Sequence, residues 1–272
     1  VLMIDADPQM SLTHAFTHKD DWLNWMSQNK TIKGFLDHYL QRKDVPDISR
    51  YFVQPERINL LLQSQRQGSL NLIASDMLLF DTEIELGAQL LWMNEQYQKP
   101  KYFEVHSLLR QSIQSLHEQK VFDVLLIDCP PNFGVLTRNA LVASDYYLIP
   151  TKPDYLSTMG MPTLKNNLDR FMDRFNECIP NHGQEAAPKS LGIIYTMVQY
   201  SAGSPITAQY KFIAKPLSQS FHPFKNMVRQ NNTVFGEERR VPVILDSTRS
   251  GSTYDTVRRE LHAIVDEMLG RL

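Results

Sequence analysis

Disulfide-forming cysteines, long apolar stretches and an excess of one charge are all missing from this sequence of 272 residues. Only Cys129 and Cys178 are present, which argues against a disulfide scaffold and a Cys-rich zinc site. No run reaches the roughly 18 consecutive apolar residues of a membrane-spanning helix, so we expect no membrane partner. The 28 basic and 30 acidic residues give a net charge of −2, which excludes an overall basic protein but not a local basic patch.

The chain opens on an apolar run, residues 1–4, that is followed at once by Asp5 and Asp7. A secretory signal has a positive segment ahead of its apolar core, so this opening does not resemble one. We therefore expect a soluble, globular, cytoplasmic protein. The opening run already predicts a buried strand.

Short apolar runs alternate with helical patterns along the chain. Continuous apolar strands are typical of a parallel sheet that is covered on both faces. The alternation therefore predicts an α/β fold, doubly wound, with a mostly parallel sheet flanked by helices. The strands are expected at 1–4, near 70–73, and at 121–127, 146–149 and 191–195, and the clearest helices at 102–116, 161–179 and 254–269.

Two of the predicted strands end in acidic residues. The first is followed by Asp5 and Asp7, the second by Asp128, and a proline comes soon after each. One Asp at a strand end is more often the start of a turn or a helix cap than a functional group. Two such ends favour carboxylates that hold magnesium through water, as in P-loop NTPases.

Several segments resemble the ParA-type partition ATPases, a family of P-loop ATPases with a deviant Walker A motif that includes MinD-like and Soj-like proteins. The resemblance covers most of residues 1–200 and follows the family's order and spacing. It lies in Val1–Gln9 with Ser11–Thr13, in the Walker B-like Phe122–Pro131, and in Leu136–Asp145, Ile149–Ser157 and Leu191–Met197. Shorter matches lie at Thr31–Ile32, Thr82–Leu86 and Ser250–Glu260.

The resemblance implies roles for individual residues around ATP and Mg²⁺. Asp128 would be the Walker B carboxylate that holds magnesium through water, and Asp5 would lie in the metal's outer shell. Asp7 would orient the attacking water or sense the γ-phosphate. The switch that reports the nucleotide state would comprise Pro130, Pro131 and Gly134, and the residues near the nucleotide base would be Thr196 and Met197.

The family's phosphate-binding loop is missing from these residues. None of the 11 glycines belongs to a Gly-x-x-x-x-Gly-Lys-Ser/Thr sequence, whose backbone N–H groups and lysine would cradle phosphate. Two interpretations stay open: about 30 to 40 further residues upstream supply a strand, the loop and a helix, or this is a short form that cannot hold ATP in the usual way. We favour the first, with residues 1–272 as the rest of one ParA-like domain. The chain alone is then expected to bind ATP poorly.

The resemblance also implies partners: a homodimer formed with ATP, non-specific DNA on the nucleoid, and a ParB-like centromere-binding protein that stimulates hydrolysis. Binding to DNA needs basic side chains clustered on one face. An ordinary solvated surface is an equally good interpretation of the basic residues in the C-terminal third. The candidates are Lys211, Lys215, Lys225, Arg229, Arg239 and Arg240.

The sequence therefore predicts an ATPase of plasmid or chromosome partition. In this interpretation ATP drives dimerisation and DNA association, and hydrolysis releases both. Two alternatives stay open. One is a ParA-like regulatory or scaffolding module without nucleotide chemistry, and the other is an ATPase that positions a protein cargo.

Overall fold

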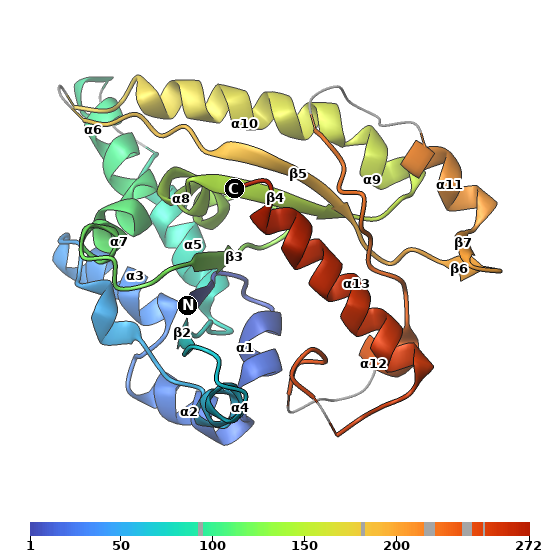
Figure 1. Cartoon of the computed structure of the whole chain (residues 1–272). Helices are drawn as coiled ribbons and strands as arrows, with labels where there is room; N and C mark the ends of the chain where they lie inside the picture. The colour runs from blue at the N-terminus through green and yellow to red at the C-terminus, as the bar shows by residue number, and fades with distance from the viewer. Residues whose placement is uncertain (92–94, 181–182, 215–220, 236–240, 247) are drawn as a thin grey trace. The chain divides into compact units, whose positions relative to one another are not determined.

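The computed structural model describes residues 1–91, 95–180, 183–214, 221–235, 241–246 and 248–272, with only the backbone at 95–97 (Figure 1). The chain divides into two compact units. The first comprises Val1–Ser144, Asp173–Ala187 and Arg240–Pro242, and the second comprises Asp145–Met172, Pro188–Arg239 and Val243–Leu272. Among the described residues, no helix combines the length and the hydropathy needed to cross a bilayer.

A parallel sheet of three strands in the order β2-β1-β3 forms the centre of the first unit. Its elements are β1 Leu2–Asp5, α1 Ser11–Phe16, α2 Lys19–Ser27, α3 Ile32–Arg42, the 3-10 helix η1 Ile48–Tyr51, α4 Glu56–Ser64, β2 Asn71–Ile73, α5 Leu79–Ala88, α6 Glu95–His106, α7 Leu108–Glu118, β3 Leu125–Asp128 and α8 Val135–Ala143.

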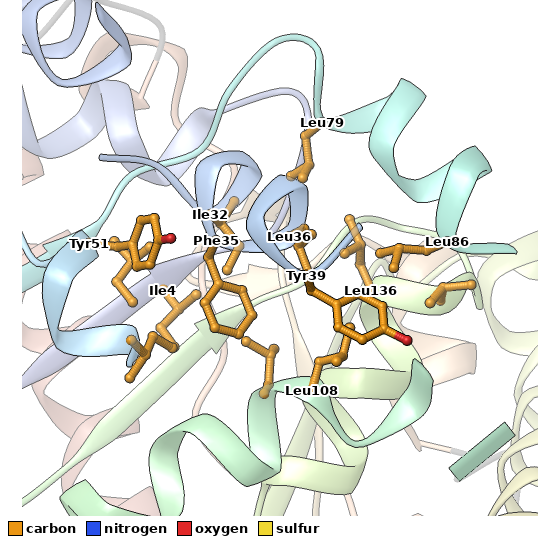
Figure 2. Close-up of a cluster of buried hydrophobic side chains, with 14 of the residues drawn as sticks. Ile4, Ile32, Phe35, Leu36, Tyr39, Tyr51, Leu79, Leu86, Leu108 and Leu136 are labelled. Carbon is orange, nitrogen blue, oxygen red and sulfur yellow. The ribbon is translucent and has the colours of Figure 1, made fainter. Parts of the chain in front are cut away.

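Helices cover both faces of this sheet. Leu2 and Ile4 join the main core cluster, which is built with α3, α5, α7 and α8. Figure 2 shows Phe35, Leu36 and Tyr39 of α3 within this cluster. Met3, whose side chain alternates to the other face as in any strand, packs instead against a second cluster around Trp22 of α2. The predicted doubly wound α/β fold is therefore confirmed.

The third strand is shorter than the sequence predicts. The apolar run begins at Val121, but β3 begins at Leu125, opposite Leu2 of β1. Among the described residues no strand pairs with the other side of β3, so this apolar strand is an edge strand of its sheet.

The helix predicted over 102–116 is wrong as one element, because Ser107 separates α6 from α7. The Ser107 hydroxyl donates to the carbonyl of Phe103 at 2.6 Å. Asn139 of α8 supports the break, since its amide nitrogen donates to the Val105 carbonyl at 2.9 Å. Its side-chain oxygen accepts from the Leu109 backbone N–H at 3.4 Å. Asn139 thus satisfies backbone groups that a continuous helix would have paired internally.

The second unit is built on a parallel pair of strands, β4 and β5. Ile193 and Tyr195 of β5 pack in one cluster with Phe221, and Ile194 packs in another with Ile264. The predicted helices over 161–179 and 254–269 are confirmed with slightly different ends. The elements are β4 Tyr146–Thr151, α9 Tyr155–Met159, α10 Met161–Asn176, β5 Lys189–Tyr195, β6 Tyr200–Ser201, β7 Ser204–Pro205, α11 Thr207–Ala214, α12 Asn232–Phe235 and α13 Ser252–Leu269. The last turn of α10, from Asp173, belongs to the first unit.

Candidate functional site

The two acidic strand ends lie beside each other in the first unit. Asp5 ends β1 and Asp128 ends β3, and the two residues occupy the same register position of the parallel pair. The backbone N–H of Ala6 continues the pairing by donating to the Asp128 carbonyl at 2.9 Å. The two carboxyl-bearing strand ends that the sequence predicts to share a site are therefore brought together at the carboxyl edge of the sheet.

Asp5 is fully buried and is held by hydrogen bonds. Its Oδ2 accepts from both the backbone N–H and the hydroxyl of Thr13 at 2.7 Å each, and its Oδ1 accepts from the Asp7 N–H at 3.1 Å. Burial raises the pKa of this carboxyl, and the charge of Asp7 adds to the rise. The hydrogen bonds from Thr13 and Asp7 lower the pKa but do not cancel the effect of burial. Asp5 thus fixes the turn that carries Asp7 and the start of α1.

A second layer of hydrogen bonds ties this turn to the end of β2. The Ser75 N–H donates to the Thr13 hydroxyl oxygen at 2.9 Å, and the Ser75 hydroxyl donates to the Asp7 carbonyl at 2.7 Å. The Trp22 indole N–H donates to the Ser75 carbonyl at 3.1 Å. Sequence reasoning assigned no role to Thr13 or Ser75. Thr13 stood inside a family-like segment, but no local signal identified Ser75.

Asp128 is the solvent-exposed carboxylate of the site. The pKa of Asp128 is raised to about 6, chiefly by desolvation and also by the negative charges of Asp5 and Asp7, although a hydrogen bond from the Cys129 backbone lowers it. Asp7 is half-buried, and its Oδ1 accepts from the Gln9 N–H at 2.9 Å. The repulsion that Asp128 feels from Asp5 and Asp7 would be relieved by a nearby cation.

These carboxylates do not form a closed metal cage. No group of three or more His, Cys, Asp or Glu side chains in the described part of the chain could hold a metal ion. Asp128 and Asp7 can therefore supply only part of a cation's oxygen ligands. Water, or the ligand that the cation accompanies, would supply the rest, as for magnesium in P-loop NTPases.

The predicted switch segment links β3 to α8. The carbonyl of Pro130 accepts from the Asn132 N–H at 2.8 Å, Pro131 is exposed, and the Asn132 side-chain oxygen accepts from the Gly134 N–H at 2.8 Å. Gly134 precedes α8 as its N-terminal cap residue. The segment is therefore a compact turn directly after the Asp128–Cys129 pair.

Glu83 of α5 joins this segment, which sequence reasoning did not anticipate. Its Oε1 accepts from the Leu136 N–H at 3.2 Å and so caps the first turn of α8. A Cβ on Gly134 would lie 2.1 Å from the same oxygen, so only glycine fits there without displacing Glu83. The close approach couples α5 to the turn after Asp128.

The residues predicted near a nucleotide base, Thr196 and Met197, belong to the second unit. Thr196 follows β5, and its N–H donates to the Thr151 carbonyl at 2.8 Å. Met197 has a left-handed backbone with φ of 57°, and its side chain is 49% exposed. Their predicted role stays a prediction.

The basic residues proposed for DNA are in different situations. Lys211 on α11 and Lys225 are exposed. Arg229 is engaged within the second unit, because its guanidinium pairs with Glu260 at 2.6 Å and lies 4.9 Å from the centre of the Tyr200 ring. Lys215, Arg239 and Arg240 lie outside the described residues.

Residues 1–180 match a protein-family model described as an AAA domain. Among curated relatives, the chromosome partitioning protein ParA of Myxococcus xanthus is 35% identical over 75 residues, which are 28% of this chain and 26% of that protein. The matches extend over 23% to 44% of the length of the curated relatives, so the chain covers well under two thirds of each.

Solved structures share the fold at low sequence identity. The structure of apo McdA from Cyanthece has a TM-score of 0.66 and 17% identity, with 98% of this chain and 86% of that one covered. The cobyrinic acid a,c-diamide synthase of Mycobacterium smegmatis, solved with a bound ATP analog and magnesium, has a TM-score of 0.61 and 19% identity. The match covers 97% of this chain and 81% of the synthase chain.

Proposed function

The chain belongs to the AAA-domain family and is a ParA-type P-loop ATPase within it, and from this premise we propose that it drives DNA partition by binding and hydrolysing ATP. The observation that carries the proposal is the pair of acidic strand ends. Asp5 and Asp128 share one register position at the carboxyl edge of a parallel sheet, where open α/β sheets bind their ligands.

Within this proposal each carboxylate has a separate task. Magnesium, when bound, would supply Lewis-acid stabilisation of phosphate charge. Asp128 would hold the metal through water, because it is solvent-exposed and its pKa is raised by desolvation and by Asp5 and Asp7. Asp5 is buried and already engaged by Thr13, so its task is to position the turn. Asp7 follows on that turn and would orient the attacking water.

The phosphates of ATP do not fit the residues of this chain alone. No Gly-x-x-x-x-Gly-Lys-Ser/Thr loop occurs in the 272 residues, and carboxylates repel phosphate. We therefore propose that an upstream strand, loop and helix complete the single ParA-like domain. The open side of β3 supports this arrangement, because Leu126 in an apolar edge strand is 41% exposed and such an edge is suited to pair with another strand.

Binding of ATP by two proteins tests this part of the proposal. The 272-residue chain should bind ATP weakly, and the full-length product of its reading frame should bind it tightly in the presence of magnesium. Tight binding by the 272-residue chain would contradict the need for an upstream loop. Absence of binding by the full-length product would favour the scaffolding module without nucleotide chemistry.

The partners follow from the same premise. We propose an ATP-dependent homodimer that associates with non-specific DNA on the nucleoid, and a ParB-like centromere-binding protein that stimulates hydrolysis. Of the candidate DNA-binding residues that the structure describes, Lys211 and Lys225 are exposed, and Arg229 contributes less because Glu260 neutralises it. Affinity for DNA should require ATP and fall steeply with salt. ATP hydrolysis without any DNA affinity would favour a protein cargo instead.

A further inference from the structure

Helix α5 is apolar on two opposite sides. One side, with Leu79 and Leu86, is buried in the core cluster shown in Figure 2, where it packs with α3 and α8. The other side carries large apolar side chains that are more than half exposed. On α5 itself these are Phe80 and Ile84, with exposed fractions of 57% and 55%. Exposed apolar residues continue just outside the helix at Met77, Leu78 and Leu91, with 54%, 55% and 60%.

The exposed residues form a stripe because of their spacing. Steps of three or four positions bring residues onto one side of a helix. Phe80, Ile84 and Ala88, which is also exposed, follow one another at steps of four within α5. Single exposed apolar residues are ordinary on a protein surface, but a continuous row of them marks an interaction surface. We name the row Phe80, Ile84 and Ala88, which Met77 and Leu91 flank beyond the two ends of the helix, the α5 stripe.

Acidic residues border the α5 stripe along one margin. Asp81 and Glu85 each follow a stripe residue, lie one helical turn apart and are exposed. Neither forms an ion pair with any basic side chain in the described ranges. An apolar row with an unneutralised acidic margin is complementary to an amphipathic helix that carries lysine or arginine beside its own apolar row.

We propose that the α5 stripe is the docking surface for a basic amphipathic helix of a partner protein. The inference rests on the proposed function in one respect, the effect of docking on hydrolysis. Glu83, adjacent to Ile84 but on the buried side, caps α8 through the Leu136 N–H and lies against Gly134. A partner that shifts α5 therefore acts on the turn that follows Asp128.

Peptide binding tests the docking surface without any nucleotide. The probe is a fluorescein-labelled 14-residue helical peptide of leucine and lysine with leucines at stripe spacing, followed by fluorescence anisotropy. The double variant Phe80→Gln/Ile84→Gln should weaken binding at least about tenfold, because two apolar side chains leave the interface. The matched control Leu23→Gln/Leu60→Gln changes two exposed leucines on α2 and α4 and should bind as the unchanged protein does.

Charge is tested separately from apolar contact. The variant Asp81→Asn/Glu85→Gln should weaken binding of the leucine–lysine peptide and reduce its salt dependence, and a leucine–glutamate peptide should not bind. Equal affinities for all variants, or equal binding of both peptides, would overturn the proposal. Sedimentation of the protein alone gives a further outcome. If Phe80→Gln/Ile84→Gln turns a dimer into a monomer, a second copy covers the stripe and the proposal is also overturned.

These measurements remain informative if the protein hydrolyses no ATP, since none of them depends on nucleotide. Failure of peptide binding with intact hydrolysis would overturn the docking surface alone. Peptide binding without hydrolysis would support the docking surface and contradict the proposed function.

Discussion

Asp5 and Asp128 occupy the same register position on neighbouring strands, yet Asp5 is fully enclosed and Asp128 is exposed. The difference arises because α1 and the end of β2 cover Asp5 through Thr13 and Ser75, whereas β3 is an edge strand. One carboxyl therefore holds the local structure and the other stays available to a ligand.

The raised pKa of Asp128 predicts a pH dependence of stability. The folded protein takes up this proton near pH 6, whereas an unfolded aspartate titrates near about 4. Between about pH 4 and about pH 6 the folded state therefore binds more protons than the unfolded state. The contribution of Asp128 to stability is lost as the pH rises through this range. Asp128→Asn removes this effect. Urea unfolding measures the free energy of unfolding of both proteins. The value for the unchanged protein minus the value for the variant should fall as the pH rises through this window. A constant or rising difference would contradict the assignment.

Thr13→Val should destabilise the first unit by about 2 to 3 kcal/mol, because a buried carboxylate loses a donor and the Ser75 N–H loses its acceptor. Valine has nearly the same volume, so packing changes little. Urea unfolding measures the effect. Thr256→Val is the matched control, since the Thr256 hydroxyl donates to the Ser252 carbonyl in an exposed hydrogen bond on α13, and it should change stability by less than about 0.5 kcal/mol. Equal effects of the two variants would refute the buried network.

Gly134→Ala should destabilise the protein by about 1 to 2 kcal/mol, because the added Cβ would lie 2.1 Å from the Glu83 carboxylate. Removing Glu83 should relieve part of this cost, so Glu83→Ala/Gly134→Ala is expected to be non-additive. Thermal unfolding of the single and double variants gives the coupling. The control is Gly87→Ala on α5, where the nearest atom is 3.9 Å away. It should be neutral or stabilising by up to about 1 kcal/mol, and full additivity at Gly134 and Glu83 would disprove the contact.

Glu267 predicts an acid dependence of the second unit. Burial raises its pKa, but hydrogen bonds from the Lys225 and Asn226 backbone and from the Arg271 and Asn226 side chains outweigh that effect and lower it to about 2. Its stabilising contribution is therefore full above about pH 4.5 and is lost as the pH falls towards 2. Glu267→Gln should cost about 2 kcal/mol at neutral pH in chemical unfolding and little near pH 2. Asp266→Asn, at the exposed neighbouring position, should behave as the unchanged protein; equal losses would contradict the account.

The sequence predicted the elements whose signal is local. The apolar runs at 1–4 and 191–195 appear as β1 and β5, since each is continuous and ends in a polar residue. The β6–β7 pair was not predicted because each strand has only two residues. The break at Ser107 was missed because Asn139, more than 30 positions away, stabilises it.

The same limit applies to the site. Asp5 and Asp128 were found because an acidic residue directly after an apolar strand is visible in a short window. Ser75 and Glu83 act through hydrogen bonds to residues 62 and 53 positions away. Their roles depend on the way in which β2 and α5 pack, and no local pattern encodes that packing.

Magnesium-dependent ATP hydrolysis by the full-length product of the reading frame tests the central claim most directly. The unchanged protein and Asp123→Asn, a variant at an exposed acidic residue just before β3, should hydrolyse ATP at similar rates. Asp128→Asn should lose at least about a hundredfold in rate, or about 2.7 kcal/mol of transition-state stabilisation, while it still folds. Hydrolysis by Asp128→Asn at the rate of the unchanged protein would contradict the claim that the end of β3 is the catalytic edge.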